Sequence, residues 1–232
     1  MGVRSDRVRL TSVPSRRTPV PRPTVVLMVR HGTTPTTGKI LPGRAPDLHL
    51  SAAGLAQAGE VAARIGHLTS QGQGTPVAVY ASPLERTLET ARPIARQLGL
   101  RVRSDRGLLE CDFGTWTGAQ LKVLAKKPEW AQVQRWPSGF RFPGGESFVE
   151  MQARITSTIA RLVRLHPGET IVVVSHADPI KAAVAAAAGT HLDLFQRLVI
   201  SPCSVSALAY SEHGPLVLCV NATASLSGLV MS

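Results

Sequence analysis

The chain has 232 residues, 44% of them hydrophobic, which suits one large α/β domain or two small ones. No apolar run approaches the ~20 residues that a membrane-spanning helix needs, so we expect a soluble protein with no membrane partner. The net charge is +11 but the aromatic content is 4%, too low for a base-stacking surface, so small anions are favoured over nucleic acid as partners.

Residues 1–23 are predicted to be a disordered basic tail. They contain six arginines and one aspartate, a net charge of +5, together with Pro14, Pro19, Pro21 and Pro23. The segment shows neither apolar periodicity nor the apolar core of a signal peptide; an Arg-rich transit peptide is the alternative. We therefore assign the folded domain to residues 24–232.

Strands and helices alternate from residue 25 to residue 103. A continuous apolar run at 25–29 predicts a strand buried on both faces, and 77–81 and 100–103 predict two more. Ser51 is expected to cap one helix, and Ser82 with Glu85 forms a capping-box pattern before another, with Pro83 at its first position. Pro93 should kink or end that second helix. The inward positions are Leu55, Ala58, Ala62 and Ile65 in the first helix and Leu84, Leu88, Ala91, Ala95 and Leu98 in the second.

The second half of the chain begins with an irregular segment, 105–146, which we expect to cross the carboxyl edge of the sheet with short helices. Ser147 and Glu150 form a capping box before a helix with Phe148, Met151, Ile155, Ile159 and Leu162 inward. A strand at 171–174 precedes a helix capped by Asp178, and 205–209 and 216–220 form a hairpin. This alternation predicts a three-layer α/β sandwich, a mostly parallel sheet flanked by helices, with the active site at the carboxyl edge of the strands.

Polar residues suited to chemistry stand where the predicted strands end. The set is Arg30-His31-Gly32, Arg86, Glu110 and His176. Because the carboxyl ends of parallel strands meet at one edge of a sheet, these side chains should lie together. Gly32 is expected to let the backbone turn sharply and approach a bound group. An arginine beside an imidazole suggests an anion held next to a nucleophile or base.

The cysteines and the remaining histidines give no metal-binding pattern. Cys111, Cys203 and Cys219 lie far apart without a CxxC or Cys/His spacing, so reduced thiols and a cytoplasmic location are expected. No metal and no cofactor is predicted. The side chains expected at the surface or in packing are His49, His67, His166, His191, His213 and Trp116.

Six motifs occur in one order along the chain: RHGTT (30–34), LHLSAAGLAQA (48–58), ASPLERTLETA (81–91), LLECDFGTWTG (108–118), FPGGES (142–147) and VVVSHADPIKA (172–182). Together they resemble the histidine phosphatase superfamily, the phosphoglycerate-mutase-like fold, and within it the branch of small phosphatases and phosphomutases. The resemblance implies His31 as the nucleophile that forms a phosphohistidine. It implies that Arg30, Arg86 and His176 hold the phosphoryl oxygens.

The resemblance also implies an acid and further phosphate contacts. Glu110 would be the general acid, with Asp112 as the competing carboxylate. Thr34, Thr37 and the backbone amide of Ala177 would contact phosphate, although Thr37 stands where many members of the family have asparagine.

The function implied is a metal-independent phosphomonoester hydrolase that acts on a small phosphorylated metabolite. The alternative is a phosphomutase, which returns the phosphoryl group to an organic acceptor. Phosphoglycerate mutases carry an Arg-Arg doublet where this chain has Gln134-Arg135-Trp136, which favours the hydrolase. A third hypothesis is a non-catalytic module that binds phospho-ligands or nucleic acid. A homodimer is left open, and Lys122, Lys126, Lys127, Arg135 and Arg141 are expected to face either substrate or solvent.

The two implied catalytic groups set an expected pH dependence. His31 must be neutral and Glu110 protonated, but their reference pKa values, ~6.5 and ~4.3, are in the wrong order. Neighbouring arginines should lower the pKa of His31, and burial should raise that of Glu110. We therefore expect a bell-shaped kcat/KM profile with its maximum at roughly pH 5–6.5.

Overall fold

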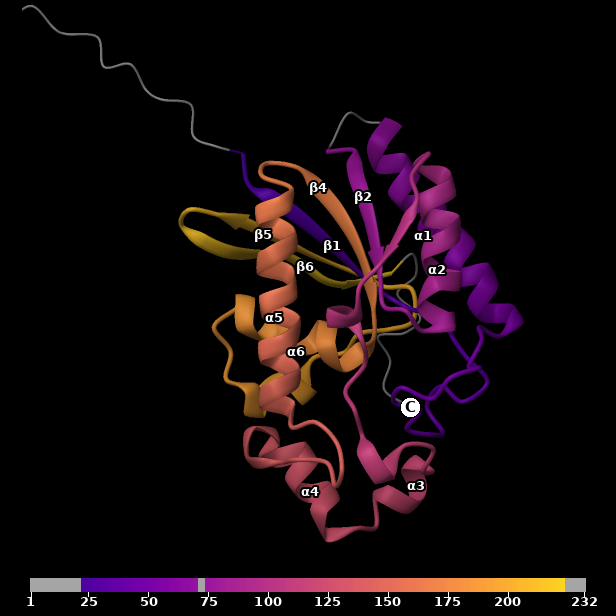
Figure 1. The fold of residues 1–232 in the computed structure, drawn as a ribbon, viewed down its shortest axis with the longest axis vertical. Coiled ribbons are helices and arrows are strands. Elements are labelled where there is room, and N and C mark those ends of the chain that lie inside the picture. The colour runs from indigo at the N-terminus through magenta and orange to yellow at the C-terminus, as the bar shows by residue number, and fades with distance from the viewer. Residues whose placement is uncertain (1–21, 71–73, 224–232) are drawn as a thin grey trace, which may run out of the picture.

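The computed structural model describes residues 22–70 and 74–223 (Figure 1). Apart from Arg22 and Pro23, the predicted tail lies outside the described residues and stays a prediction. The strands are β1 (Thr24–Arg30), β2 (Pro76–Ala81), β3 (Val102–Ser104), β4 (Thr170–Ser175), β5 (Val205–Ser211) and β6 (Gly214–Ala222). The α-helices are α1 (Ala52–Ser70), α2 (Glu85–Gln97), α3 (Leu121–Leu124), α4 (Pro128–Arg135), α5 (Phe148–Leu165) and α6 (Ala177–Ala187).

The strands form a single six-stranded sheet in the order β3-β2-β4-β1-β5-β6. The pairs β3–β2, β2–β4 and β4–β1 are parallel, whereas β5 runs antiparallel to both β1 and β6. The mostly parallel sheet and the C-terminal hairpin are therefore confirmed.

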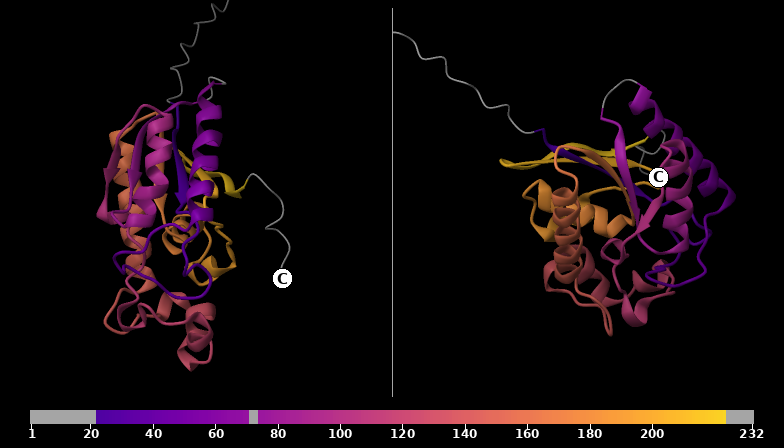
Figure 2. Two further views of the ribbon diagram at one scale, coloured as in Figure 1. Left: turned by 90° about the vertical axis from the view of Figure 1, so that its right-hand side faces the viewer. Right: turned by 45° about the horizontal axis from the view of Figure 1, so that its top comes forward.

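β1 illustrates why the sheet is covered on both faces. Val26 and Met28 pack in a core cluster with side chains of α5 and α6, whereas Leu27 and Val29 pack in another with side chains of α1 and α2. Successive side chains of a strand point to opposite faces, so a continuous apolar run needs a partner layer on each side. Figure 2 shows the two helix pairs on opposite faces of the sheet. The three-layer sandwich is confirmed.

The predicted helix starts divide into two groups. The hydroxyl of Ser51 accepts a hydrogen bond from the Gly54 N–H, and the capping box of Ser147 is complete, so both of these caps are confirmed. The capping box at Ser82 is wrong, because α2 begins at Glu85 with Leu84 at its N-cap and no side-chain cap. The cap at Asp178 is also wrong, because α6 begins at Ala177 with His176 at its N-cap.

The inward positions of α5 are confirmed, but the two earlier helices differ from expectation. Leu55 is 56% exposed, because the neighbouring Gly54 is the residue packed against the loop after β1. α2 continues through Pro93 to Gln97, so Pro93 does not end it. Its buried face includes polar residues, since that face adjoins the site described below; the buried side chains are Arg86, Thr87, Thr90, Ala91, Ile94 and Ala95.

The irregular segment 105–146 carries α3, α4 and short 3-10 helices, which Figure 1 shows beyond the end of the sheet, as predicted. Trp116 is buried against Trp130, Phe140 and Phe142, which confirms that it packs. Within the described residues, none of the helices combines the length and apolarity needed to cross a bilayer.

Candidate active site

A pocket of about 390 Å³ opens at the carboxyl edge of the sheet. Its lining includes six of the predicted site residues: Arg30, His31, Thr34, Thr37, Glu110 and Ala177. Arg86, on the first turn of α2, and His176, directly after β4, are fully buried. The rings of His31 and His176 lie 5.3 Å apart between centroids, so His176 adjoins the pocket from behind His31.

The imidazole of His31 is held in one tautomer. Its Nδ1 lies 2.7 Å from the Gly32 carbonyl oxygen, which can only accept, so Nδ1 carries the proton and Nε2 keeps a lone pair. Burial lowers the pKa of His31 well below its usual 6.5, and the charges of Arg86 and Arg30 lower it further. His31 is therefore neutral and suited to act as a nucleophile.

Gly32 also has a packing role that the sequence did not predict. A Cβ at Gly32 would lie 2.6 Å from the backbone oxygen of Gly54, and a Cβ at Gly54 would lie 2.1 Å from the Thr33 oxygen. The two glycines thus let α1 approach the loop that carries His31. The Gly32 N–H also donates to the Thr90 hydroxyl at 3.1 Å, which ties this loop to α2.

Several buried hydrogen-bond donors around His31 have no partner within the part of the chain that the structure describes. One nitrogen of each guanidinium is used structurally: Arg30 Nη1 donates to the Ile200 oxygen at 2.6 Å, and Arg86 Nη2 donates to the Gly43 oxygen at 2.7 Å. The unpartnered buried nitrogens are Arg30 Nε, Arg86 Nε, Arg86 Nη1 and His176 Nδ1. Buried polar groups in native proteins are rarely left unpaired. Such a cluster of cationic donors fits a bound anion with several oxygens, such as a phosphoryl group.

His176 is oriented by a residue that sequence reasoning missed. The hydroxyl of Ser82 lies 2.9 Å from His176 Nε2, so this serine, expected to cap a helix, instead holds the second histidine. Burial lowers the pKa of His176 well below 6.5, followed by the charge of Arg86. A neutral His176 with a proton on Nδ1 can donate to an anion, while Nε2 accepts from the serine.

Glu110 shares the pocket lining with a second carboxyl group, that of Asp178. Burial, followed by the charge of Asp178, raises the pKa of Glu110 to about 7, against the opposing effects of the Cys111 N–H, Arg86 and Arg30. Asp112, the competing carboxylate, is absent from the pocket lining; its side chain is 43% exposed and contacts Arg44 at 3.5 Å. A carboxylic acid that is protonated below pH 7 and a neutral imidazole therefore line the same pocket.

The two threonines of the loop after β1 contact each other at the pocket. Thr37 Oγ1 accepts from the Thr34 N–H at 2.9 Å and lies 3.0 Å from the Thr34 hydroxyl. Both hydroxyls thus have a loop partner, and both side chains line the pocket.

One wall of the pocket was not anticipated. Asp178 and Lys181, both on α6, lie 3.6 Å apart, and the Lys181 ammonium donates to Gln196 at 2.9 Å. Lys181 follows Ala177 by four residues, so helical spacing places it on the face of α6 that carries Ala177, a signal the sequence did contain.

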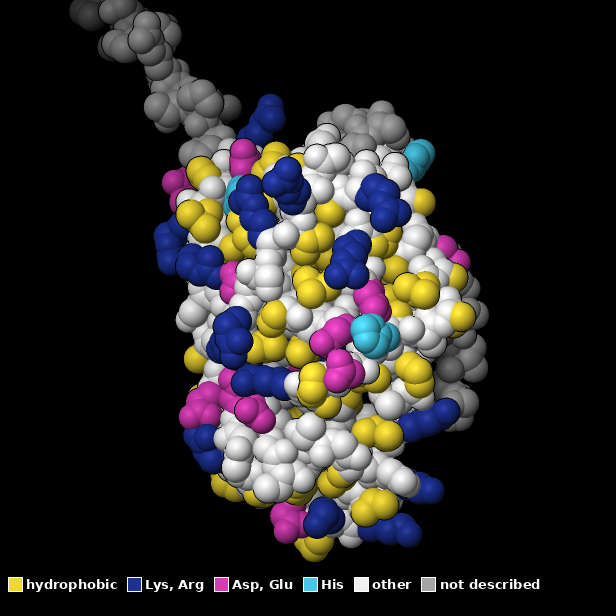
Figure 3. Space-filling view, turned by 45° about the vertical axis from the view of Figure 1, so that its right-hand side comes forward, with side chains coloured by type: hydrophobic (Ala, Val, Ile, Leu, Met, Phe, Trp, Pro, Cys, Tyr) yellow, Lys and Arg dark blue, Asp and Glu magenta, His cyan; other side chains and the backbone are white. Residues whose placement is uncertain are grey.

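The basic residues of 119–146 are exposed and are absent from the lining of this pocket; they are Lys122, Lys126, Lys127, Arg135 and Arg141. Arg141 pairs with Glu150. Lys122 lines a neighbouring pocket that shares Gly38 and Ile40 with this one, so for Lys122 both substrate and solvent stay open. On the face drawn in Figure 3, basic side chains alternate with acidic and apolar ones instead of forming the continuous stripe that nucleic-acid backbones favour.

Within the described residues, no group of three His, Cys, Asp or Glu side chains could hold a metal ion. The three cysteines, Cys111, Cys203 and Cys219, are free thiols.

Known proteins resemble the chain along most of its length. It is 33% identical over 206 residues to a bifunctional protein of Mycobacterium tuberculosis, covering 88% of this chain but 55% of that protein, so it spans about half the length of this relative. It is 31% identical over 189 residues to a Salmonella paratyphi C protein named probable phosphoglycerate mutase GpmB, covering 81% of this chain and 85% of the relative.

Solved structures share the fold. A mycobacterial glucosyl-3-phosphoglycerate phosphatase superposes with a TM-score of 0.75 at 26% identity, covering 87% of this chain and 100% of that one. The family model described as histidine phosphatase superfamily (branch 1) matches residues 26–223. The chain therefore belongs to the histidine phosphatase superfamily.

Proposed function

We propose that the protein is a phosphomonoester hydrolase that transfers the phosphoryl group of a small phosphorylated metabolite first to His31 and then to water. The observation that carries this proposal is the unprotonated Nε2 of a buried, neutral His31 beside unpartnered donors of Arg30, Arg86 and His176. A binding module has use for the donors but not for a nucleophile held in one tautomer.

In the first half of the reaction, His31 Nε2 attacks phosphorus and the bond from phosphorus to the ester oxygen breaks. Glu110 gives its proton to the departing oxygen, which its pKa of about 7 allows below neutral pH. Phosphoryl transfer depends mainly on positioning and charge stabilisation, and the guanidinium groups of Arg30 and Arg86 supply both to the phosphoryl oxygens.

In the second half, the Glu110 carboxylate accepts a proton from water as the water oxygen attacks phosphorus. The bond from phosphorus to Nε2 breaks, and inorganic phosphate and free His31 are regenerated. Because Arg30, Arg86 and His176 supply the stabilising charge and hydrogen bonds, we propose that hydrolysis needs no metal ion.

The competing function is a phosphomutase, which the relative named probable phosphoglycerate mutase favours. A mutase that handles phosphorylated acids must also hold a second anionic group. Among the described residues, the cationic side chains that line this pocket are Arg30 and Lys181, and Lys181 is paired with Asp178 at 3.6 Å. This pairing favours the hydrolase, and product analysis separates the two: free phosphate for a hydrolase, a moved phosphoryl group for a mutase.

The decisive experiment is a phosphate-release screen over many phosphomonoesters, with and without chelator, on wild type and His31→Ala. Wild type should release phosphate in both conditions and carry an acid-labile phosphoryl label after quenching. His31→Ala should lose several orders of magnitude in rate and carry no label, whereas the control His213→Ala, whose side chain is 82% exposed, should match wild type. An active His31→Ala, or activity abolished by chelator and restored by a divalent ion, would reject the mechanism.

A further inference from the structure

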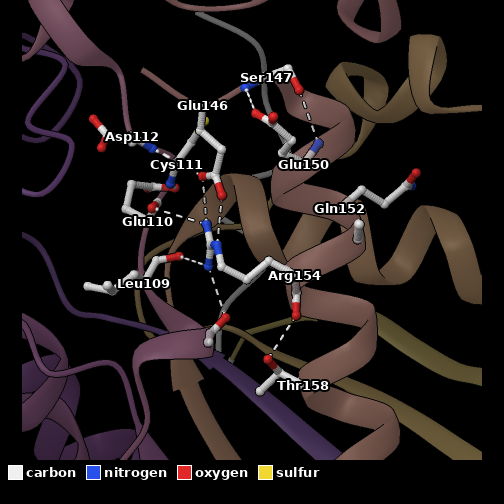
Figure 4. A network of polar contacts seen from close by, with 12 residues as sticks. Leu109, Glu110, Cys111, Asp112, Glu146, Ser147, Glu150, Gln152, Arg154 and Thr158 are labelled. Atoms are coloured by element: carbon white, nitrogen blue, oxygen red, sulfur yellow. Dashed lines mark hydrogen bonds and ion pairs between the residues drawn. The ribbon is translucent and has the colours of Figure 1, made fainter. Parts of the chain in front are cut away.

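The backbone on both sides of Glu110 is held by Arg154, which Figure 4 shows, and by Arg44 from the loop after β1. Arg154, on α5, donates through Nη1 to the oxygens of Gly107 and Leu109 at 2.9 and 2.8 Å, and through Nη2 to the Glu110 oxygen at 3.3 Å. Arg44 donates from Nε to the same Glu110 oxygen at 2.8 Å. These bonds supply partners for carbonyl groups of an irregular segment, so they fix the peptide planes that carry Glu110.

Glu146 holds the two arginines in place. Its carboxylate accepts from Arg154 Nε at 2.8 Å and Nη2 at 2.9 Å, a paired geometry that restricts the guanidinium plane. The same carboxylate accepts from Arg44 Nη2 at 3.0 Å and from the Asp112 N–H at 3.3 Å. The Glu146 side chain is 13% exposed, so solvent competes weakly for these bonds. One carboxylate thus orders two cations that would otherwise repel each other.

The position of the Glu110 carboxyl group depends on this backbone. Its Oε1 accepts from the N–H of the next residue, Cys111, at 2.9 Å, so the side chain is anchored to the peptide that follows it. The network also reaches the phosphoryl-binding side, because the neighbour of Arg44, Gly43, accepts the 2.7 Å hydrogen bond from Arg86. The same loop therefore links the proposed acid to the arginine that would hold the phosphoryl group.

We propose that Glu146, with Arg154 and Arg44, is a positioning residue for proton transfer: it sets the place of the Glu110 carboxyl group relative to the leaving oxygen. This inference rests on the proposed function, in which Glu110 protonates that oxygen. Because a misplacement of about 1 Å can cost on the order of 10²-fold in rate, loss of the carboxylate should impair proton transfer while the phosphoryl-binding donors remain.

The test compares esters that need an acid with esters that do not. Alkyl phosphates release a strongly basic alkoxide unless it is protonated, whereas 4-nitrophenyl phosphate releases a stable anion. Glu146→Gln should lower kcat/KM for an alkyl phosphate by about 10- to 100-fold and kcat/KM for 4-nitrophenyl phosphate by less than about 3-fold. The comparison uses kcat/KM because that constant reports phosphorylation of His31 and excludes the later hydrolysis step, in which Glu110 acts as the base for every ester. Arg44→Lys keeps the charge but removes the Nε bond to the Glu110 oxygen, so it should show the same bias to a smaller extent.

A matched control comes from the same helix. Arg161 lies two helical turns after Arg154 and pairs with Asp105, just before the segment that Arg154 holds. Arg161→Ala should change the rates for both ester types by the same small factor. Arg44→Lys, whose arginine side chain is 30% exposed, remains informative should Glu146→Gln fail to fold, and melting curves identify that case.

Each outcome decides between the proposals. The first case is that Glu110→Gln itself loses more activity toward the alkyl phosphate than toward 4-nitrophenyl phosphate. The positioning role is then overturned if Glu146→Gln and Arg44→Lys lose activity equally toward both esters, or if neither variant loses activity. If Glu110→Gln shows no bias, the choice of acid is wrong and the positioning inference falls with it. Wild type without phosphate release from any ester would overturn the proposed function instead.

Discussion

The raised pKa of Glu110 makes the pH profile of Asp178→Asn a sharp test of the site. In wild type, a pKa of about 7 places the upper limb of kcat/KM near neutrality. The protonated fraction of such a group falls from ~0.9 at pH 6 to ~0.1 at pH 8, so kcat/KM should fall about tenfold between them. The lower limb, set by His31, lies well below pH 6.5, consistent with the expected acid-side maximum.

Asp178→Asn removes the charge that ranks second to burial in raising this pKa, so the pKa of Glu110 should fall. Arg86 and Arg30 keep lowering it, and Lys181, freed from Asp178, acts in the same direction. For a decrease of one unit, corresponding to ~1.4 kcal/mol, the protonated fraction at pH 7 drops from about one half to about one tenth. The rate at pH 7 should therefore drop roughly fivefold for a shift of one unit.

The assay is kcat/KM for an alkyl phosphate between pH 4.5 and 9, where protonation of the leaving oxygen matters most. Lys181→Gln serves as the opposite control, since it keeps the Asp178 charge and removes the cation paired with it, so the upper limb should move to higher pH and not to lower pH. An upper limb that stays put in Asp178→Asn, or that moves to higher pH, would refute the assignment of that limb to Glu110.

Three further predictions concern stability and the second histidine. Gly54→Ala should destabilise the fold by about 1–3 kcal/mol, because its Cβ would lie 2.1 Å from a backbone oxygen. Gly59→Ala, which has open space around its Cβ position, should be neutral or stabilising by up to ~1 kcal/mol. Denaturant unfolding measures both variants, and equal effects would contradict the close packing at Gly54. Folding raises the pKa of Glu110 from 4.5 to about 7, so the stability that its protonation contributes is present below pH 4.5 and is lost as pH rises through 7. At pH 8, Glu110→Gln should therefore be more stable than wild type by about 3 kcal/mol at most, which a higher melting temperature would show. At pH 4 the variant should show no such gain. Ser82→Ala removes the 2.9 Å partner of His176 and should lower kcat/KM for 4-nitrophenyl phosphate by about tenfold, and an unchanged value would show that this bond does not orient the ring.

The strands and strand ends could be predicted because their signals are local. The apolar runs of β1 and β4 lead directly into His31 and His176, and the parallel topology that brings these ends together follows from the alternation of elements. The capping box of Ser147 was also readable, since its partner is Glu150 on the same turn. Buried strands and helix caps of this kind can be predicted because residues close in sequence determine whether they form.

The same pattern failed at Ser82, where the competing partner is 94 residues away in sequence. The serine hydroxyl can form a hydrogen bond either with a backbone N–H at the start of a helix or with the ring of His176. The residues next to Ser82 in the sequence carry no information about the second partner. The size of the pKa shift at Glu110 could not be predicted for a similar reason. Burial and Asp178 raise this pKa whereas Arg86 and Arg30 lower it, and the balance depends on distances set by the whole fold. Lys181 was missed despite its regular helical spacing from Ala177.

The central place of β1 has a consequence for synthesis of the chain. Its neighbours in the sheet are β4 and β5, and Val25 pairs with Thr170, about 145 residues later. At ~5–20 residues per second, a ribosome needs roughly 7–30 s to supply that partner. During this time the apolar strand β1, which directly precedes the proposed nucleophile His31, has neither neighbour, and contacts this distant in sequence form slowly. A nascent chain stopped before β4 should therefore bind a hydrophobic-surface dye or a chaperone through residues 24–30, and release it once β4 is complete.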